Sequence, residues 1–328
     1  MSAAIGMQQA SDHLSRRDVL ASAGFAAGAA LVSGMSNTST AAETKSSKHG
    51  NFTFCLNTST IRGHKLGIVG ELELAAKAGY RAVEPWLLPI NEYMKQGGTL
   101  KDLRKRCDDL GLQIVSAIAF PQWVVDDDAT RAKGLEQAKQ DMDVVAQLGG
   151  RRIAAPPAGV PKESAPLDLK KIAERYRAML ELGDQTGVVP ELEFWGPSPH
   201  LHTLSQAMFV AMESGHPKAC ILADVYHMYK GGSSIETLGL ASGPAIVTLH
   251  MNDYPADPPI DKINDSARIF PGDGIAPISK ILRTLHDNGA STKLSLELFN
   301  QDYWRQDALK VATTGLEKMK AEVEKALV

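Results

Sequence analysis

The feature that most constrains the fold of this chain is a unit that repeats from residue 51 to residue 328: an amphipathic helical stretch, a glycine and a short apolar run. Glycine is favoured directly after a helix because it adopts a left-handed backbone conformation at little cost. The glycines that close the helical stretches are Gly79, Gly111, Gly149, Gly187, Gly215, Gly243 and Gly289. The apolar runs predict strands at 51–56, 81–85, 113–119, 151–155, 188–194, 219–225, 245–250 and 292–298.

The alternation of eight strands with helices indicates the fold class. Residues 51–328 allow about 35 residues for each strand–helix unit, close to what a barrel of roughly 250 residues needs. A doubly wound open sheet is the alternative, but no G-x-G-x-x-G sequence follows the first strand and no Walker loop occurs. The sequence therefore predicts an α/β protein with one domain, a (β/α)8 TIM barrel over residues 51–328.

Charge and cysteine content exclude several classes of function. The chain has 35 Lys and Arg residues against 38 Asp and Glu, a formal charge of −3, so no nucleic-acid partner is expected. The three cysteines, Cys55, Cys107 and Cys220, form no C-x-x-C pair, which argues against a disulfide framework and against a thiolate zinc site. A homo-oligomer is left open.

Residues 1–50 have the pattern of an export signal followed by a linker. Arg16 and Arg17 precede an uncharged stretch, 19–35, and the small residues 39–42 follow it. This resembles a twin-arginine signal, and it predicts a periplasmic or otherwise exported protein. The uncharged stretch is shorter than the roughly 20 apolar residues that a membrane span requires, so no stable membrane insertion is expected. A disordered tail is the alternative.

Four residues with metal-ligating side chains lie at the ends of four consecutive predicted strands. They are Glu193, Asp224, His250 and Glu297. In a (β/α)8 barrel these strand ends meet at one rim, where active sites are built. Three carboxylates and one imidazole suit a single divalent ion such as Mn²⁺, Co²⁺, Mg²⁺ or Zn²⁺, and acids at apolar strand ends are costly without a compensating cation. Salt-bridged rim residues are the alternative interpretation.

Five short segments carry a resemblance to a known family. They are Leu-Glu-Phe-Trp-Gly at 192–196, Asp-Val-Tyr-His at 224–227, His-Met-Asn-Asp at 250–253, Arg-Ile-Phe-Pro-Gly-Asp-Gly at 268–274 and Leu-Glu-Leu-Phe-Asn at 296–300. With them the chain resembles the xylose isomerase-like barrel superfamily of sugar phosphate isomerases and epimerases, and its ketose 3-epimerase branch in particular. Endonuclease IV of the same superfamily uses additional metal-binding histidines that are missing here, which disfavours DNA repair.

The resemblance implies roles for individual residues. The positions matching Glu193, Asp224, His250 and Glu297 would hold the metal, and those matching His227 and Arg268 would contact substrate oxygens. Trp86, Trp123 and Trp195 follow strand ends and are expected to form apolar walls against a sugar ring. Four further polar residues on that side of the barrel are left unranked: Asn57, His64, Glu84 and Lys230.

These residues predict an enzyme that moves a proton beside a carbonyl of a small-molecule sugar. A divalent ion would stabilise the enediolate, while Glu193 and Glu297 would remove and return the proton. The predicted activity is that of a metal-dependent isomerase or epimerase of a ketose, inosose or related sugar. Two alternatives stay open: a metal-dependent lyase or hydrolase acting on 3-keto-glycosides, and a catalytically silent sugar-binding barrel.

Overall fold

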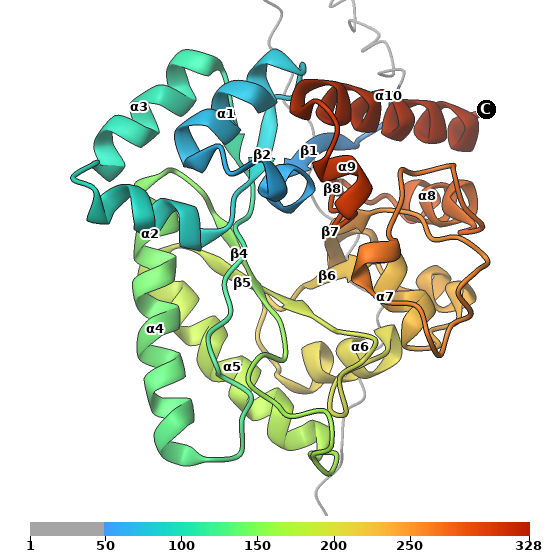
Figure 1. The fold of residues 1–328 in the computed structure, drawn as a ribbon. Coiled ribbons are helices and arrows are strands. Elements are labelled where there is room, and N and C mark those ends of the chain that lie inside the picture. The colour runs from blue at the N-terminus through green and yellow to red at the C-terminus, as the bar shows by residue number, and fades with distance from the viewer. Residues whose placement is uncertain (1–48) are drawn as a thin grey trace, which may run out of the picture. The chain divides into compact units, whose positions relative to one another are not determined.

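Eight parallel strands curl into a barrel in the computed structural model, which describes residues 49–328 (Figure 1). The strands are β1 (Thr53–Asn57), β2 (Ala82–Glu84), β3 (Gln113–Ile114), β4 (Arg152–Ala155), β5 (Val189–Glu193), β6 (Ile221–Asp224), β7 (Ile246–Met251) and β8 (Lys293–Leu296). This confirms the α/β barrel. The predicted export signal lies outside the described residues.

The strand order around the sheet is β3-β2-β1-β8-β7-β6-β5-β4, so the first and last strands lie side by side. β3 and β4 stand at the two ends of this order. A backbone hydrogen bond joins β4 to the segment after β3: the Ala154 N–H donates to the carbonyl of Ala117, at 2.9 Å. Ala117 follows β3, which is shorter than the predicted strand 113–119 because the chain beyond Ile114 pairs irregularly.

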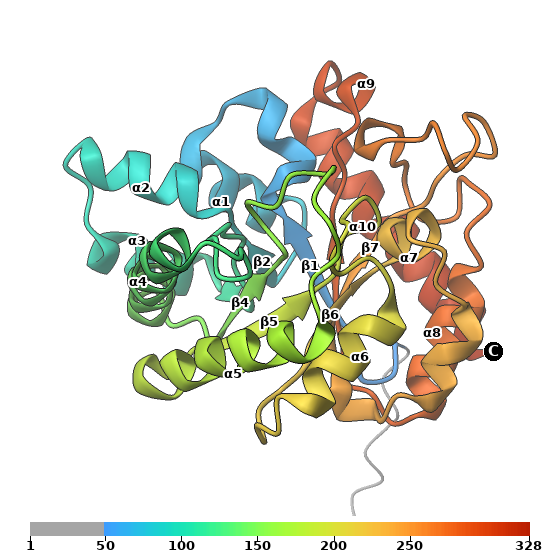
Figure 2. The ribbon, with the colours of Figure 1, turned by 90° about the horizontal axis from the view of Figure 1, so that it is seen from below.

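Helices lie outside the ring of strands (Figures 1 and 2). The α-helices are α1 (Gly67–Lys77), α2 (Leu87–Lys95), α3 (Leu100–Leu110), α4 (Asp128–Gln147), α5 (Leu169–Thr186), α6 (Leu204–Glu213), α7 (Val225–Lys230), α8 (Ile278–Asp287), α9 (Gln301–Trp304) and α10 (Ala308–Leu327). Short 3-10 helices are η1 (Thr58–His64), η2 (Ile235–Leu240), η3 (Gly243–Ala245) and η4 (Asp265–Ala267). Among the described residues, no helix is both long enough and apolar enough to cross a bilayer.

Sequence signals at both ends explain where the helices begin and end. The side chains of Asp127, Asp168 and Asp307 accept hydrogen bonds from first-turn N–H groups of α4, α5 and α10. Six of the seven predicted glycines have a positive φ. The prediction is wrong for Gly243, which begins η3 and whose Cα packs against the backbone of the turn after α8, leaving no room for a Cβ.

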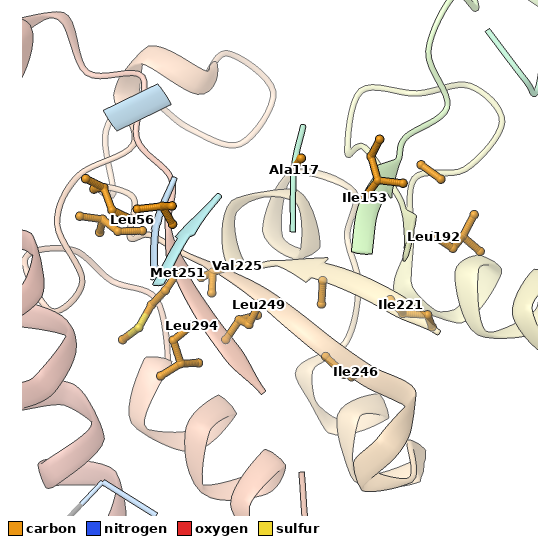
Figure 3. Close-up of a cluster of buried hydrophobic side chains, with 14 of the residues drawn as sticks. Leu56, Ala117, Ile153, Leu192, Ile221, Val225, Ile246, Leu249, Met251 and Leu294 are labelled. Carbon is orange, nitrogen blue, oxygen red and sulfur yellow. The ribbon is translucent and has the colours of Figure 1, made fainter. Parts of the chain in front are cut away.

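The alternation of side chains along the strands gives the barrel an apolar outside and a polar inside. Leu192, Leu249 and Leu294 belong to the continuous hydrophobic core that also includes the buried faces of the helices (Figure 3). Residues one position away point the other way, as Glu193 and His250 do, and are also buried. The strands therefore deliver polar side chains to a common interior.

Candidate metal centre and substrate cavity

The four predicted metal ligands converge at the carboxyl end of the barrel. Glu193 and Asp224 end β5 and β6, His250 lies near the end of β7, and Glu297 directly follows β8. The Nδ1 atom of His250 is 3.0 Å from Glu297 Oε2, 3.4 Å from Asp224 Oδ2 and 3.8 Å from Glu193 Oε1. All four residues are at most 4% exposed. The structure thus brings Asp224, His250 and Glu297 into one group that could hold a metal ion, and Glu193 approaches that group at His250 without belonging to it.

Strand register explains this convergence. Asp224 and His250 are direct partners across β6 and β7, so both side chains point into the barrel at one level. On β8, Ser295 is the partner of His250, and Glu297 lies two residues further along and therefore on the same face.

The donor set fits a divalent ion. Asp224, His250 and Glu297 each offer one ligand atom, and these atoms lie within 4.8 Å of one another. His250 Nδ1 is fully buried among carboxylates, yet it has no hydrogen bond of acceptable geometry to any described residue. A buried nitrogen that faces acids without a hydrogen bond is suited to coordination, and oxygen ligands with one imidazole suit Mn²⁺, Co²⁺ or Zn²⁺.

A second group of residues contacts the other ring nitrogen of His250, Nε2. Glu84, at the end of β2, lies with its Oε2 atom 3.0 Å from His250 Nε2, and it accepts hydrogen bonds from Asn57 at 2.9 Å and Ser295 at 2.6 Å. All four side chains are fully buried. With Nε2–H directed at a carboxylate, the Nδ1 lone pair faces the other acids.

Asn57 and Glu84 are among the polar residues that the sequence leaves without an assigned role, and Ser295 carries no signal in the sequence. The available signal was position: Glu84 ends a strand, as Glu193 and Asp224 do. Sequence alone does not distinguish an acid that faces a metal from an acid that holds a metal-binding histidine.

The acids and the histidine shift each other's protonation. Burial alone would lower the pKa of His250, but Glu297 and Glu84 raise it well above its usual value. Burial raises the pKa of Glu193 to about 8, with Glu297 and Asp224 adding to the rise and His250 opposing it. Burial would also raise the pKa of Asp224, but the Arg268 guanidinium holds it far below its usual range. The cluster thus requires positive charge for its stability.

Arg268 supplies part of that charge. Its Nη1 atom donates to Asp224 Oδ2 at 2.7 Å and to Glu297 Oε2 at 2.8 Å, and its Nη2 atom donates to Asp265 at 2.6 Å and lies 3.2 Å from His227 Nε2. Arg268 is 1% exposed although it comes from a loop. The two residues proposed to contact substrate oxygens therefore adjoin both the acids and each other.

The spacing of the segment 224–227 follows from helix capping. Asp224 ends β6 and caps α7, because its Oδ1 atom accepts a hydrogen bond from the backbone N–H of His227 at 2.9 Å. Burial lowers the pKa of His227 despite the nearby Asp224 carboxylate. The cap places the imidazole beside the acid cluster in its neutral form at neutral pH.

Glu193 and Glu297 of the cluster line the floor of a cavity of about 450 Å³ together with His227 and Arg268, while Asp224 and His250, which contact these residues, do not line it. Four aromatic side chains line its wall, and neighbouring ring centroids are 5.1–6.1 Å apart: Trp86, Phe120, Trp195 and Phe299. A cavity with apolar rings above and charged groups below suits a small polyhydroxylated ligand. Phe120 and Phe299 were not among the predicted substrate contacts.

The structure does not place Trp123 in this cavity, which corrects the expectation that it contacts the sugar. Trp123 is fully buried, its indole N–H donates to the Pro156 carbonyl at 2.8 Å, and its ring lies near Tyr176 of α5. The indole therefore anchors the loop after β4 against the helix layer.

Comparisons with known proteins agree with this architecture. A family model described as xylose isomerase-like TIM barrel matches residues 72–322. The chain belongs to the xylose isomerase-like TIM barrel family. The match spans β2 to β8 and therefore contains every candidate ligand.

Three proteins similar to this chain share about a quarter of its residues. Inosose isomerase of Bacillus velezensis is 27% identical over 83% of this chain and 97% of its own length. A crystal structure of the IolI protein with a binding zinc atom superimposes with a TM-score of 0.76 at 25% identity, over 83% of this chain and 98% of the other. A 3-dehydroshikimate dehydratase of Pseudomonas aeruginosa is 26% identical over 76% of this chain but only 39% of its own length.

Proposed function

We propose that this chain is a divalent-metal-dependent isomerase or epimerase of a ketose, inosose or related sugar. The observation that carries the proposal is the arrangement of His250 Nδ1 among the carboxylates of Glu193, Asp224 and Glu297, two of which, Glu193 and Glu297, line the aromatic cavity. The similarity to inosose isomerase supports an inosose or a related cyclic or open-chain keto sugar. The similarity to a zinc-containing structure supports a transition-metal ion.

Glu193 and Glu297 are the two groups proposed to move the proton. Burial raises the pKa of Glu193 to about 8, whereas Glu297 accepts hydrogen bonds from Arg268 and Asn57 and is positioned as a base. Two carboxyl groups in unlike environments can act as acid and base in one turnover. A bound divalent ion would stabilise negative charge on the enediolate oxygens.

Residues around these acids would orient the substrate. His227 and Arg268 line the cavity beside Glu297; Arg268 can donate to sugar oxygens that do not react, and the imidazole of His227 can donate to or accept from them. Trp86 and Trp195 face the cavity and suit the carbon–hydrogen face of a sugar. Return of the proton to the opposite face would give epimerisation, and its return to the adjacent carbon would give isomerisation.

The test is hydrogen–deuterium exchange followed by proton NMR in D₂O. Protein loaded in turn with Mn²⁺, Co²⁺, Mg²⁺ or Zn²⁺ is incubated with ketoses, inososes and 3-keto-glycosides, and the metal is removed before acquisition. We expect loss of the signal of a proton beside the carbonyl, and we expect Glu297→Gln to slow that loss by about 10²–10⁴ because a carboxamide is not a base. Absence of exchange with every metal, or full activity of the variant, would contradict the proposal.

A lyase is the second candidate, and the similarity to a dehydratase favours it. The same proton removal can expel a leaving group one carbon further on, for example from a 3-keto-glycoside. New vinylic or free-leaving-group signals in the same spectra would identify a lyase. Exchange of any kind excludes a silent binding barrel.

We further propose that the protein is exported. This rests on Arg16 and Arg17 before the uncharged stretch 19–35, which are sequence features alone.

A further inference from the structure

Two positively charged side chains stand at the mouth of the cavity, above the acid cluster. Arg62 belongs to η1, directly after β1, and Lys162 belongs to the loop between β4 and α5. Both line the cavity and both are exposed. Among the described residues, neither side chain forms an ion pair with an acid or donates a hydrogen bond; Arg62 contacts aromatic rings instead.

The acids that line the cavity are already paired with other side chains. Glu297 and Asp265 contact Arg268, and Glu193 faces His250. These three are the acids among the described residues that line the cavity. The cavity therefore has buried acids suited to a metal, whereas Arg62 and Lys162 are exposed cations without an acid partner among the described residues.

Aromatic rings fix the guanidinium of Arg62 in place. Its central carbon lies 4.7 Å from the ring centroid of Trp86, 5.2 Å from that of Phe299 and 5.4 Å from that of Trp304. A guanidinium stacked on ring faces keeps its N–H groups directed outward in its own plane, where they can donate to a planar or tetrahedral oxyanion.

The backbone of η1 is also held. Gly63 packs so closely on Trp304 that a Cβ would collide with the ring, and His64 Nε2 bonds to the carbonyl of Gln306 at 2.9 Å. Arg62 is thus a pre-organised donor, because the segment that carries it is tied to α9 and the chain after it. Phe299 connects it to the floor, since the Arg268 guanidinium lies 5.1 Å from the same ring.

We propose that Arg62, assisted by Lys162, forms an anion-binding subsite, so that the sugar substrate carries a carboxylate or a phosphate on the end that faces the mouth. This inference rests on the proposed function, since it assumes that the reacting end of the sugar lies at the metal floor. A neutral sugar would make no use of two unpaired cations at the mouth, whereas an oxyanion would gain charge-assisted hydrogen bonds from the guanidinium.

A matched series of ketoses provides the test. D-Fructose, D-fructuronate and D-fructose 6-phosphate share the ketose end and differ at the far carbon, which bears a hydroxyl, a carboxylate or a phosphate. Their affinities for the Mn²⁺-loaded protein are measured by calorimetry and by tryptophan fluorescence, in low and high salt. We expect at least one anionic sugar to bind tenfold or more tightly than fructose, with a preference that weakens in high salt. The tighter of the two identifies the anion.

Variants assign the preference to its residue. Arg62→Gln should abolish the preference for the anionic sugar over fructose, and Lys162→Gln should reduce it. Arg62→Lys, which keeps the charge but not the planar group, should retain part of it. Lys95→Gln is the control, because Lys95 is exposed on α2, does not line the cavity and changes the net charge equally.

Three results would overturn the subsite: equal affinity for the three sugars, no binding of either anionic sugar, or a preference that persists in Arg62→Gln. Proton exchange in D₂O is recorded in parallel with the same sugars and reports on the proposed function separately. An anion preference without exchange would refute the proposed chemistry and leave the subsite standing, and exchange without an anion preference would do the reverse.

Discussion

Replacing Glu84 by glutamine tests whether this buried acid sets the metal affinity of the site. Glu84 is fully buried and receives three polar contacts, from His250 Nε2 at 3.0 Å, Asn57 at 2.9 Å and Ser295 at 2.6 Å. A glutamine of the same size keeps one oxygen but turns an NH₂ donor toward groups that themselves donate. The imidazole loses a charged partner, and its orientation is no longer fixed.

The expected loss follows from those contacts. A hydrogen bond to a charged group contributes about 1.5–3 kcal/mol, and losses of a partner behind a metal-binding histidine weaken metal affinity by about 10–100-fold, or about 1.4–2.7 kcal/mol. We therefore expect the Zn²⁺ dissociation constant of Glu84→Gln to rise by 10–100-fold at pH 8.

The loss of Zn²⁺ affinity in Glu84→Gln should become smaller as the pH falls. Glu84 also raises the pKa of His250, so in the unmodified protein a proton competes with the metal for the imidazole. Removing the charge of Glu84 weakens this competition, and the two proteins should therefore differ less at pH 6 than at pH 8.

Competition against a chromophoric chelator measures the dissociation constants. Glu71→Gln is the control, because Glu71 is a buried acid on α1 that belongs neither to the cavity nor to the ligand cluster. Circular dichroism checks that each variant is folded. Equal Zn²⁺ affinity of folded Glu84→Gln and of the unmodified protein at pH 8 would refute the assignment of Glu84 as the residue that positions His250.

Other predictions concern metal content, stability and export. His250→Ala should lower the metal bound per chain, and unchanged stoichiometry by elemental analysis would count against its role. Burial raises the pKa of Glu71 from 4.5 to about 7, so between these pH values the folded protein keeps a proton on Glu71 that the unfolded chain releases. The folded state therefore loses up to about 3 kcal/mol of stability as the pH rises from 4.5 to above 7. Urea unfolding should show that Glu71→Gln removes this pH-dependent loss. Gly243→Ala should destabilise the fold by about 1–3 kcal/mol in the same assay, because its Cβ would meet backbone. Replacing Arg16 and Arg17 by lysine should leave the protein in the cytoplasmic fraction, and unaffected export would contradict the signal.

Much of the barrel could be predicted because its helix ends and strands depend on neighbouring residues in the sequence. A glycine that ends a helix and an apolar run that follows it are visible in the sequence, and six of the seven glycines have the expected backbone conformation. Gly243 is the exception because its reason is tertiary: the chain needs its small size where η3 meets the turn after α8. The close approach of two segments about 45 residues apart leaves no local pattern.

The candidate site divides in the same way. Glu193, Asp224 and His250 could be placed together because parallel strands bring their carboxyl ends to one rim. Trp123 and Trp195 both follow strands, yet one packs under the loop after β4 and the other lines the cavity. Which way a large side chain turns after a strand depends on the available acceptors and space, and neither is readable from the sequence.

The end of β7 links the metal floor to the substrate side of the site. His250 faces the acids, and Asn252, two residues on, donates to both oxygens of Asp224 and accepts from the backbone of α7. Asp253 accepts four backbone hydrogen bonds, from its neighbour Tyr254 and from Gly272, Gly274 and Ala276.

The carboxylate of Asp253 thus fixes the Pro-Gly-Asp-Gly turn that follows Arg268, while a pair of backbone hydrogen bonds joins Asp253 to Ile269, the residue next to Arg268. The segments 250–253 and 268–274 are therefore one structural unit, although separate in the sequence. The end of β7 accordingly carries the metal ligand His250 and also holds the segment that places Arg268 beside the carboxylates of Asp224 and Glu297.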